Sequence, residues 1–250
     1  MGKIADVGSK TNNNMKYMGG KDRIANNILP IILKDRIDNQ YYVEPFVGGC
    51  NVIDKVNGNR IGSDKSVYLI EMWKSLSNGE KFLNEIDKQT YDKARTEFNN
   101  KTNLYFSDSE IGWIGFMASY NGRFFDGGYN GNYKKRNYTK ESIDNITKQV
   151  PNVLGVDFYC CDYKELEIPY NSIIYCDIPY KNTKQYLTSK NFNHNVFFEW
   201  CREKTKQGHK VFISEYNAPD DFKCVWSGNI KSYMKAGRSE NVTEKLFTIE

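Results

Sequence analysis

The sequence predicts an α/β fold with a mostly parallel sheet, helices on both faces of it, and one small inserted lobe. Three observations favour this class. Short apolar segments alternate with segments of helical periodicity at both ends of the chain, a glycine turn follows the first apolar segment, and the alternation stops in a polar, aromatic middle stretch. Parallel strands need helical crossovers, so this order is typical of nucleotide-binding α/β units. A chain of 250 residues can bury one sizeable core and a small lobe.

The N-terminal part supplies the first half of the sheet. Residues 1–14 are polar, rich in Gly and Asn and aperiodic, and we expect a disordered leader there. Residues 22–33 carry isoleucines at helical spacing, and residues 41–46 have the pattern of a buried strand that stops at Gly48-Gly49. The further expected elements are a short helix at 52–56, a strand at 60–64 and a helix at 66–76.

The alternation resumes after Pro151 and completes the sheet. The expected elements are strands at 156–160, 171–177 and 210–214, a helix at 196–206, and a terminal strand pair at 230–236 and 245–249. Between the two halves we expect one helix, at 140–149. The chain therefore divides into one domain made of residues 15–76 and 151–250, and an insert at 77–150.

Composition and charge exclude several classes. No apolar run approaches the roughly 20 residues of a membrane span, and the N-terminus lacks the apolar core of a signal peptide, so we expect a cytoplasmic protein that contacts no membrane. The six cysteines lack zinc-ligand spacing and the two histidines stand in different segments, so we expect no metal site. A formal net charge of +4 is compatible with a nucleic-acid partner.

The first motif is the loop after the first expected strand, Glu44-Pro45-Phe46-Val47-Gly48-Gly49-Cys50-Asn51. Glycine after a strand lets the backbone approach a ligand closely. The loop matches neither phosphate-binding glycine pattern, which indicates a cofactor without phosphates, such as S-adenosylmethionine. Asp64 ends the next strand, where a carboxylate can accept hydrogen bonds from ribose hydroxyls. On their own, these features are also compatible with a structural turn and a surface acid.

The second motif, Asp177-Ile178-Pro179-Tyr180, closes an apolar strand, where open α/β sheets place their active sites. The exocyclic amine of adenine is a poor nucleophile, because its lone pair is delocalised into the ring. The Asp177 carboxylate and the Ile178 carbonyl can each accept one of its N–H bonds and stabilise the positive charge that develops on methyl transfer. Pro179 biases Ile178 toward extended geometry, and Tyr180 can stack on a base swung out of a duplex.

The order of these segments resembles the Dam-type, alpha-class family of DNA adenine methyltransferases, from about Met15 to the C-terminus. The matching segments are Tyr17-Met18-Gly19-Gly20-Lys21, Glu44 to Gly49, Asp64, a Tyr-Asn-Gly insert, Asp162, and Asp177 to Tyr180. The resemblance implies the Rossmann-like fold of S-adenosylmethionine-dependent methyltransferases. It also implies base flipping and site-specific methyl transfer to the N6 amine of adenine in double-stranded DNA. Whether a restriction enzyme accompanies the protein stays open.

The resemblance assigns roles to individual residues. An aromatic and a lysine near the N-terminus help bind the cofactor, the acid of the Cys160-Cys161-Asp162-Tyr163 segment lies beside the cofactor adenine, and Ser214 helps shape the target-base pocket. The expected catalytic residues are Asp177, Ile178, Pro179 and Tyr180. The expected cofactor-binding residues are Tyr17, Lys21, Glu44, Phe46, Gly48, Gly49, Cys50, Asn51, Asp64, Asp162, Tyr163 and Asp177.

Two positions depart from the family pattern. Gly48-Gly49-Cys50-Asn51 replaces the usual G-x-G-S/T, so the second loop glycine is displaced. Ile178 replaces the first proline of D-P-P-Y. Neither change removes a required atom, because Ile178 still offers its carbonyl. We therefore expect an active enzyme.

The insert predicts contact with DNA. Its residues 119–138 interleave basic side chains with Phe124, Phe125 and three tyrosines. Basic side chains neutralise phosphates, and aromatic side chains can wedge or stack where a base has left the helix. A solvated loop with its aromatics on the core is the structural alternative. The expected DNA-binding residues are Asn121, Arg123, Tyr129, Asn132, Lys134, Lys135 and Arg136.

Other functions remain open from the residues alone. Methylation of cytosine N4 or of RNA needs the same Asp-x-Pro-aromatic device. A catalytically silent DNA-binding homologue would keep the fold and lose methyl transfer, and the two departures support it. Methylation of cytosine C5 is disfavoured, because no Pro-Cys pair supplies the nucleophile. A dinucleotide-dependent oxidoreductase lacks a complete phosphate fingerprint.

Overall fold

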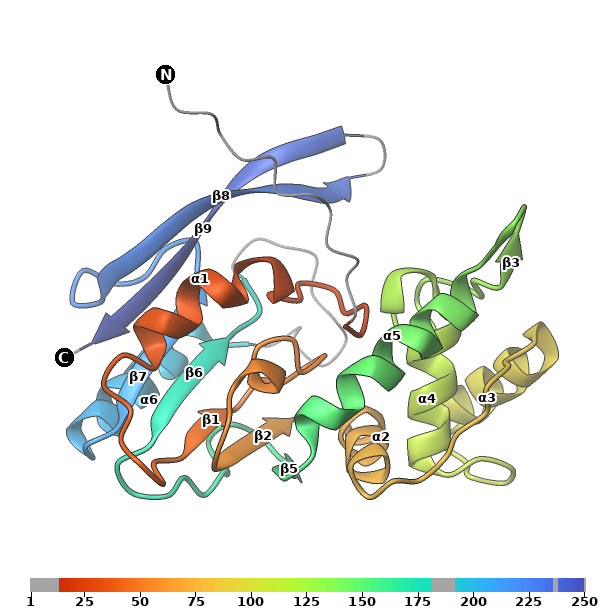
Figure 1. Ribbon diagram of the computed structural model, residues 1–250, viewed down its shortest axis with the longest axis horizontal. Helices are drawn as coiled ribbons and strands as arrows, with labels where there is room; N and C mark the ends of the chain where they lie inside the picture. Colours follow the sequence, from red (N-terminus) through yellow and green to blue (C-terminus); the bar gives the residue numbers. More distant parts are fainter. Residues whose placement is uncertain (1–13, 181–191, 236–237, 250) are drawn as a thin grey trace.

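A seven-stranded sheet forms the centre of the protein, in the order β5-β2-β1-β6-β7-β9-β8 (Figure 1). The computed structural model describes residues 14–180, 192–235 and 238–249. The strands of the sheet are β1 (Tyr42–Glu44), β2 (Arg60–Asp64), β5 (Val156–Cys160), β6 (Ile173–Asp177), β7 (Lys210–Glu215), β8 (Lys223–Lys235) and β9 (Arg238–Ile249). Strands β5, β2, β1, β6 and β7 pair in parallel, and β9 and β8 add antiparallel strands at one edge. The predicted mostly parallel α/β fold is therefore confirmed.

The two faces of the sheet carry different helices, as expected from the sequence. Side chains of neighbouring strand residues point to opposite faces, and Tyr42 and Val43 belong to separate apolar clusters. The Tyr42 face packs against α1 (Asp22–Ile32), α2 (Val67–Ser77) and α5 (Tyr138–Val153), and the Val43 face packs against α6 (His194–Lys206). Between β1 and β2 lies the short 3-10 helix η1 (Ile53–Lys55).

The terminal hairpin of β8 and β9 is longer than the sequence predicts. We expected strands at 230–236 and 245–249, whereas the ladder pairs residues from Lys223 to Lys235 with residues from Arg238 to Thr248. The hairpin extends well past the rest of the sheet (Figure 1). Polar residues such as Lys223, Asn229 and Glu244 interrupt the apolar alternation of these strands, which is the physical reason for the shorter prediction.

The insert is a small helical lobe beside the sheet, with α3 (Lys88–Asn100), α4 (Asp108–Ala118), η2 (Tyr120–Gly122) and a hairpin of β3 (Asn132–Tyr133) and β4 (Arg136–Asn137) (Figure 1). The sequence did not predict α3 and α4. A capping box, in which Ser107 and Glu110 bond each other's backbone N–H, begins α4. The residues of α4 from Ile111 to Ala118 are buried on all sides, so the helix lacks the amphipathic period.

Two expected boundaries move. The predicted helix at 140–149 begins earlier, with Asn137 as its N-cap, and continues through Pro151 to Val153, so the insert boundary at 150 falls inside α5. Of the expected leader, residues 1–13 lie outside the described residues, while Asn14 has a defined place. Its amide donates to the carboxylates of Asp22 and Asp54. Asn14, which we expected in the leader, is therefore part of the folded domain.

Candidate active site

The candidate site lies where the strand order reverses, between β1 and β6. From β1 the chain continues to β2 on one side, and β6 leads to β7 on the other. The loops after the two strands diverge at such a point, so a crevice forms at the carboxyl ends of the strands. Acids end four of the parallel strands there, namely Glu44 on β1, Asp64 on β2, Asp177 on β6 and Glu215 on β7. The sheet topology thus brings together the two sequence motifs.

The glycine loop after β1 has positive φ angles at two positions, Gly48 and Cys50. Gly48 has a φ of 47°, and a Cβ there would lie 2.8 Å from the ring of Tyr17, so Tyr17 covers the loop closely. Cys50 occupies the position of the second family glycine and has a φ of 56°. Non-glycine residues adopt this left-handed conformation at a cost of about 1 kcal/mol. The turn is therefore present in spite of the sequence departure, and the fully buried thiol of Cys50 packs inside it.

Two polar side chains in or beside the glycine loop, those of Asn51 and Asp64, offer acceptor groups to a ligand. Asn51 is 6% exposed, and its Oδ1 has no hydrogen-bond donor among the described residues. A buried acceptor without a donor is costly, so a ligand that donates there fits the site. Burial raises the pKa of Asp64, while backbone N–H groups, including that of Gly48, oppose the rise. Asp64 therefore lies beside the glycine loop, as expected.

Glu44 differs from its expected role, since its carboxylate faces the protein interior. The side chain is 3% exposed and accepts a hydrogen bond of 2.8 Å from the hydroxyl of Tyr42. Burial raises the pKa of Glu44 well above its usual value, which favours a neutral carboxyl. This arrangement gives Glu44 a structural role under the loop and leaves its contact with a cofactor a prediction.

Aromatic rings join the loop to the segments around it. The ring of Phe46 lies 5.3 Å from that of Tyr163 and 5.8 Å from that of Phe192. Next to Tyr163, Asp162 forms an ion pair of 2.5 Å with Lys65, the residue that follows Asp64. The segments after β1, β2 and β5 therefore meet on one side of the site, and the place of the cofactor adenine beside Asp162 stays a prediction.

Asp177 is held by a buried lysine. The ammonium of Lys21 lies 2.8 Å from Oδ1 of Asp177, and it also donates to the carbonyl of Gly19 at 2.9 Å. The side chain of Lys21 is 7% exposed and that of Asp177 is 24% exposed, so the carboxylate can still be reached from outside. Burial raises the pKa of Asp177 to about 6, and Lys21 opposes a larger rise. The carboxylate is therefore mostly ionised at neutral pH.

The other residues of the tetrapeptide are fixed by contacts that the sequence did not indicate. The hydroxyl of Tyr180 donates a hydrogen bond of 2.5 Å to Glu244, and the ammonium of Lys21 lies 4.5 Å from the centre of the Tyr180 ring. The carbonyl of Pro179 pairs with Nε2 of His194 at 3.0 Å. Ser214 bonds the hydroxyl of Tyr175 at 2.7 Å on the neighbouring strand.

The expected DNA-binding residues divide into two groups. Lys134 and Lys135 form the turn of the β3–β4 hairpin with exposed side chains, and Asn121 and Asn132 are exposed as well. Arg136 is exposed but pairs with Glu141 through hydrogen bonds of 2.9 and 2.8 Å. In the second group, Arg123 is half-buried, and Tyr129 is half-buried with its hydroxyl bonded to the carbonyl of Ile86.

The aromatic residues of the insert are used differently from the prediction. Phe125 is 2% exposed, and Phe124 packs on Tyr68 and Phe116, so neither is free to wedge into a duplex. They are core residues because the loop folds back on α4. Among residues 119–138, the exposed aromatics are Tyr120 and Tyr133, at 51% and 62%.

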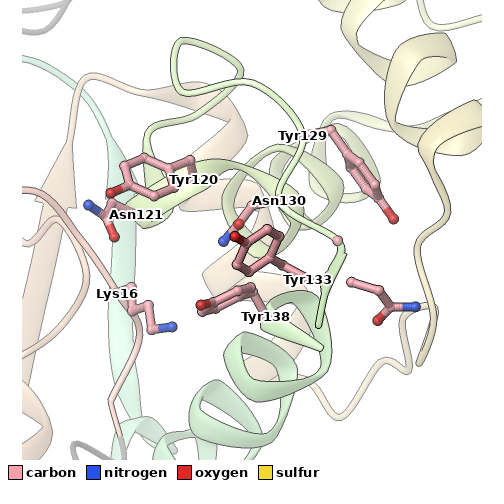
Figure 2. A pocket seen from close by; sticks show the side chains of 9 residues that line it. Lys16, Tyr120, Asn121, Tyr129, Asn130, Tyr133 and Tyr138 are labelled. Atoms are coloured by element: carbon pink, nitrogen blue, oxygen red, sulfur yellow. The ribbon is translucent and has the colours of Figure 1, made fainter. Parts of the chain in front are cut away.

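A cavity of about 520 Å³ opens beside these tyrosines. Its lining residues are Lys16, Tyr120, Asn121, Tyr129, Asn130, Gly131, Asn132, Tyr133 and Tyr138. Figure 2 shows Lys16, Tyr120 and Asn121 on one side of it, with Tyr129 set apart from them. Gly122 allows this approach, since a Cβ there would lie 1.9 Å from the carbonyl oxygen of Lys16. Only the fold places Lys16 here, because it stands more than 100 residues before Tyr120 in the chain.

Fold and site together define an α/β protein that has acids at the carboxyl ends of its parallel strands and a basic hairpin in its insert. The family model of the D12 class N6 adenine-specific DNA methyltransferases matches residues 17–241. The chain therefore belongs to this family. The match confirms the resemblance drawn from the order of the motifs.

Other comparisons add less. No curated protein matches the chain. Solved structures do match, and one is the crystal structure of SMU.472, a protein assigned as a methyltransferase, in complex with SAH, at 12% identity and a TM-score of 0.37. The match covers 92% of this chain and 52% of that one, so this chain spans about half the length of the solved protein.

The described residues contain neither a membrane-spanning helix nor a metal-ligand cluster. Within the described ranges, no helix has the length and apolar character to cross a membrane. Likewise, no cluster of His, Cys, Asp and Glu side chains in the same ranges could hold a metal ion.

Replacing Lys21 by Met should raise the pKa of Asp177 above its value of about 6, because the ammonium that favours the carboxylate is removed. A ¹³C NMR titration of protein labelled in its aspartate carboxyls measures this pKa, with Asp177→Asn identifying the resonance. Thermal unfolding confirms that both variants fold. An unchanged or lower pKa in Lys21→Met would contradict the assigned ion pair.

Proposed function

We propose that this protein transfers a methyl group from S-adenosylmethionine to the N6 amine of an adenine flipped out of double-stranded DNA. The observation that carries the proposal is the ionised, reachable carboxylate of Asp177, held by Lys21 at the end of β6 and opposite the glycine loop of β1. A carboxylate in this place serves a reaction in which positive charge develops on the substrate.

The site suits S-adenosylmethionine by its donor set. The loop between β1 and η1 has a tight glycine turn and, without a lysine or a G-x-G-x-x-G pattern, no built cradle for phosphates. Asn51 offers a buried acceptor to an ammonium group, and Asp64 can accept from ribose hydroxyls. Phe46 and Tyr163 offer apolar faces to the cofactor adenine. When bound, S-adenosylmethionine supplies the methyl group as an electrophile.

Asp177 accepts one N–H bond of the target amine. A carboxylate has about four acceptor positions, so Asp177 can bond Lys21 and the substrate at once. The carbonyl of Ile178 accepts the second N–H bond, which requires only a backbone atom and so tolerates the isoleucine. The two acceptors favour a more tetrahedral nitrogen and stabilise the charge that builds up during transfer.

Tyr180 supplies the stacking surface for the target base. Its ring makes a T-shaped contact with the ring of Tyr216, at 4.5 Å between the ring centres, and its hydroxyl is bonded to Glu244. The ammonium of Lys21 covers one face of the Tyr180 ring. If the base stacks on that face, the ammonium must move aside while it stays paired with the carboxylate of Asp177. The energy for unstacking the base comes from the contacts of the insert with DNA.

The insert binds the DNA backbone. Lys134 and Lys135 lie at the tip of the exposed β3–β4 hairpin, where they can neutralise phosphates, and the exposed rings of Tyr120 and Tyr133 lie beside the cavity. Asn121 and Asn132 can reach base edges. We also propose a cytoplasmic location, because the protein must reach its DNA substrate.

Incubation with labelled S-adenosylmethionine and mixed-sequence DNA should give N6-methyladenine after digestion to nucleosides, identified by mass spectrometry. The Asp177→Asn variant should lose at least about 100-fold in kcat, because the amide offers a weaker acceptor to the developing charge. Its binding of DNA, followed by fluorescence anisotropy, should change little.

The product distinguishes the alternatives. N4-methylcytosine, or label in RNA only, would contradict the substrate, and DNA binding without any label would favour a silent homologue. Retained turnover in Asp177→Asn would exclude Asp177 as the catalytic carboxylate.

Replacing Lys135 by Ala should weaken DNA binding and reduce the slope of log K against log salt by about 1, because one phosphate contact is lost. The matched control is Lys206→Ala, an equal change of charge at the exposed end of α6. Anisotropy titrations at several salt concentrations measure both slopes. Equal slopes in the two variants would show that Lys135 does not meet phosphate.

A further inference from the structure

A second carboxylate lies next to the catalytic tetrapeptide. Glu244 belongs to β9, where it pairs with Gly228 of β8, and its side chain is 5% exposed. A buried carboxylate needs compensating partners, since burial of a lone charge is costly. The partner of Glu244 is the hydroxyl of Tyr180, at 2.5 Å from Oε2. A strand near the C-terminus therefore touches the stacking tyrosine directly.

Glu244 also raises the pKa of the neighbouring Lys21. Burial alone lowers the pKa of Lys21, but Asp177 and then Glu244 raise it above its usual value. Lys21 thus has two acidic neighbours, of which only Asp177 bonds it directly. The cluster holds one ammonium and two carboxylates, and its surplus negative charge favours a substrate that becomes positive in the reaction.

We propose that Glu244 is a positioning residue, which fixes the ring of Tyr180 for stacking on the target adenine through the hydrogen bond to its hydroxyl. The inference rests on the proposed function and extends it to a residue outside the four-residue motif. The two residues stand 64 positions apart, and only the fold joins them.

The physical basis is restriction of the ring. A tyrosine held only by packing can rotate about its side-chain bonds, and each misplacement of a stacking surface lowers the fraction of productive complexes. A hydrogen bond to a charged group is stronger than a neutral one. The T-shaped contact with Tyr216 and the hydrogen bond to Glu244 hold Tyr180 at its ring and at its hydroxyl before the base arrives.

The same contact affects the ionisation of Asp177. Glu244 raises the pKa of Asp177, whereas Lys21 lowers it. The titratable or charged groups of the described residues around this carboxyl are Lys21, Glu44, Tyr175, Cys176, Tyr180, Tyr216 and Glu244. Neutralising Glu244 therefore moves the titration of Asp177 to lower pH.

A double-mutant cycle tests the role of Glu244. Glu244→Gln and Tyr180→Phe should each lower kcat by about 10- to 100-fold, the effect of one lost hydrogen bond to a charged group. The double variant should lose little more than either single variant, because both remove the same bond. The affinity for DNA and the KM for S-adenosylmethionine should change by less than about 3-fold, as Glu244 acts on the orientation of the ring.

The matched control is Glu203→Gln, the same substitution at an exposed position of α6, which should keep the kcat of the parent protein. The acidic limb of the pH–rate profile should move to lower pH in Glu244→Gln and stay in place in Glu203→Gln. Circular dichroism shows whether Glu244→Gln folds. If it does not, the test rests on Tyr180→Phe, which removes the same hydrogen bond and must lower kcat.

Two results would overturn the role of Glu244. One is a cycle in which the losses of the two single variants multiply in the double variant. The other is a folded Glu244→Gln protein with unchanged kcat and an unmoved acidic limb. The failure of the proposed function is a different result, in which the unsubstituted protein methylates no adenine in DNA.

Discussion

The ion pair between Lys21 and Asp177 is the contact on which the site depends. It joins the start of α1 to the end of β6, and the same ammonium bonds Gly19, in the segment that places Tyr17 over the glycine loop. Removing one partner of a buried pair costs about 3–5 kcal/mol, since the other charge stays buried. A single side chain thus favours the ionised form of Asp177 and joins the segment over the glycine loop to the strand that ends at the tetrapeptide.

The two departures from the family pattern follow from what the site needs. Cys50 adopts the left-handed backbone of the glycine that it replaces, and the surrounding core holds it in that conformation. Ile178 is 3% exposed and packs in the cluster that contains Phe197 of α6. The chemistry asks this position only for its carbonyl. Both substitutions therefore change side chains and leave the backbone geometry that the reaction uses.

The sequence predicted the parallel strands and the order of the motifs, because buried strands and glycine turns leave local patterns. It could not predict contacts between distant segments. Glu244 stands in a polar strand that resembles any exposed hairpin, and Lys16 stands more than 100 residues before Tyr120 in the chain. Helix α4 escaped prediction because all its sides are buried, which removes the amphipathic period. Phe124 and Phe125 were misjudged because composition does not tell a wedge from a core residue.

The pH dependence of kcat/KM for DNA methylation by the unsubstituted protein tests the central claim most directly, since it reports the free enzyme. Ionised Asp177 accepts the amine and its pKa is about 6, so the rate should be constant at neutral pH and fall as pH drops through about 6, because the carboxylate takes up one proton. Unfolding followed by circular dichroism over the same pH range excludes loss of structure as the cause. A profile that stays flat down to pH 5 in folded protein would contradict the account.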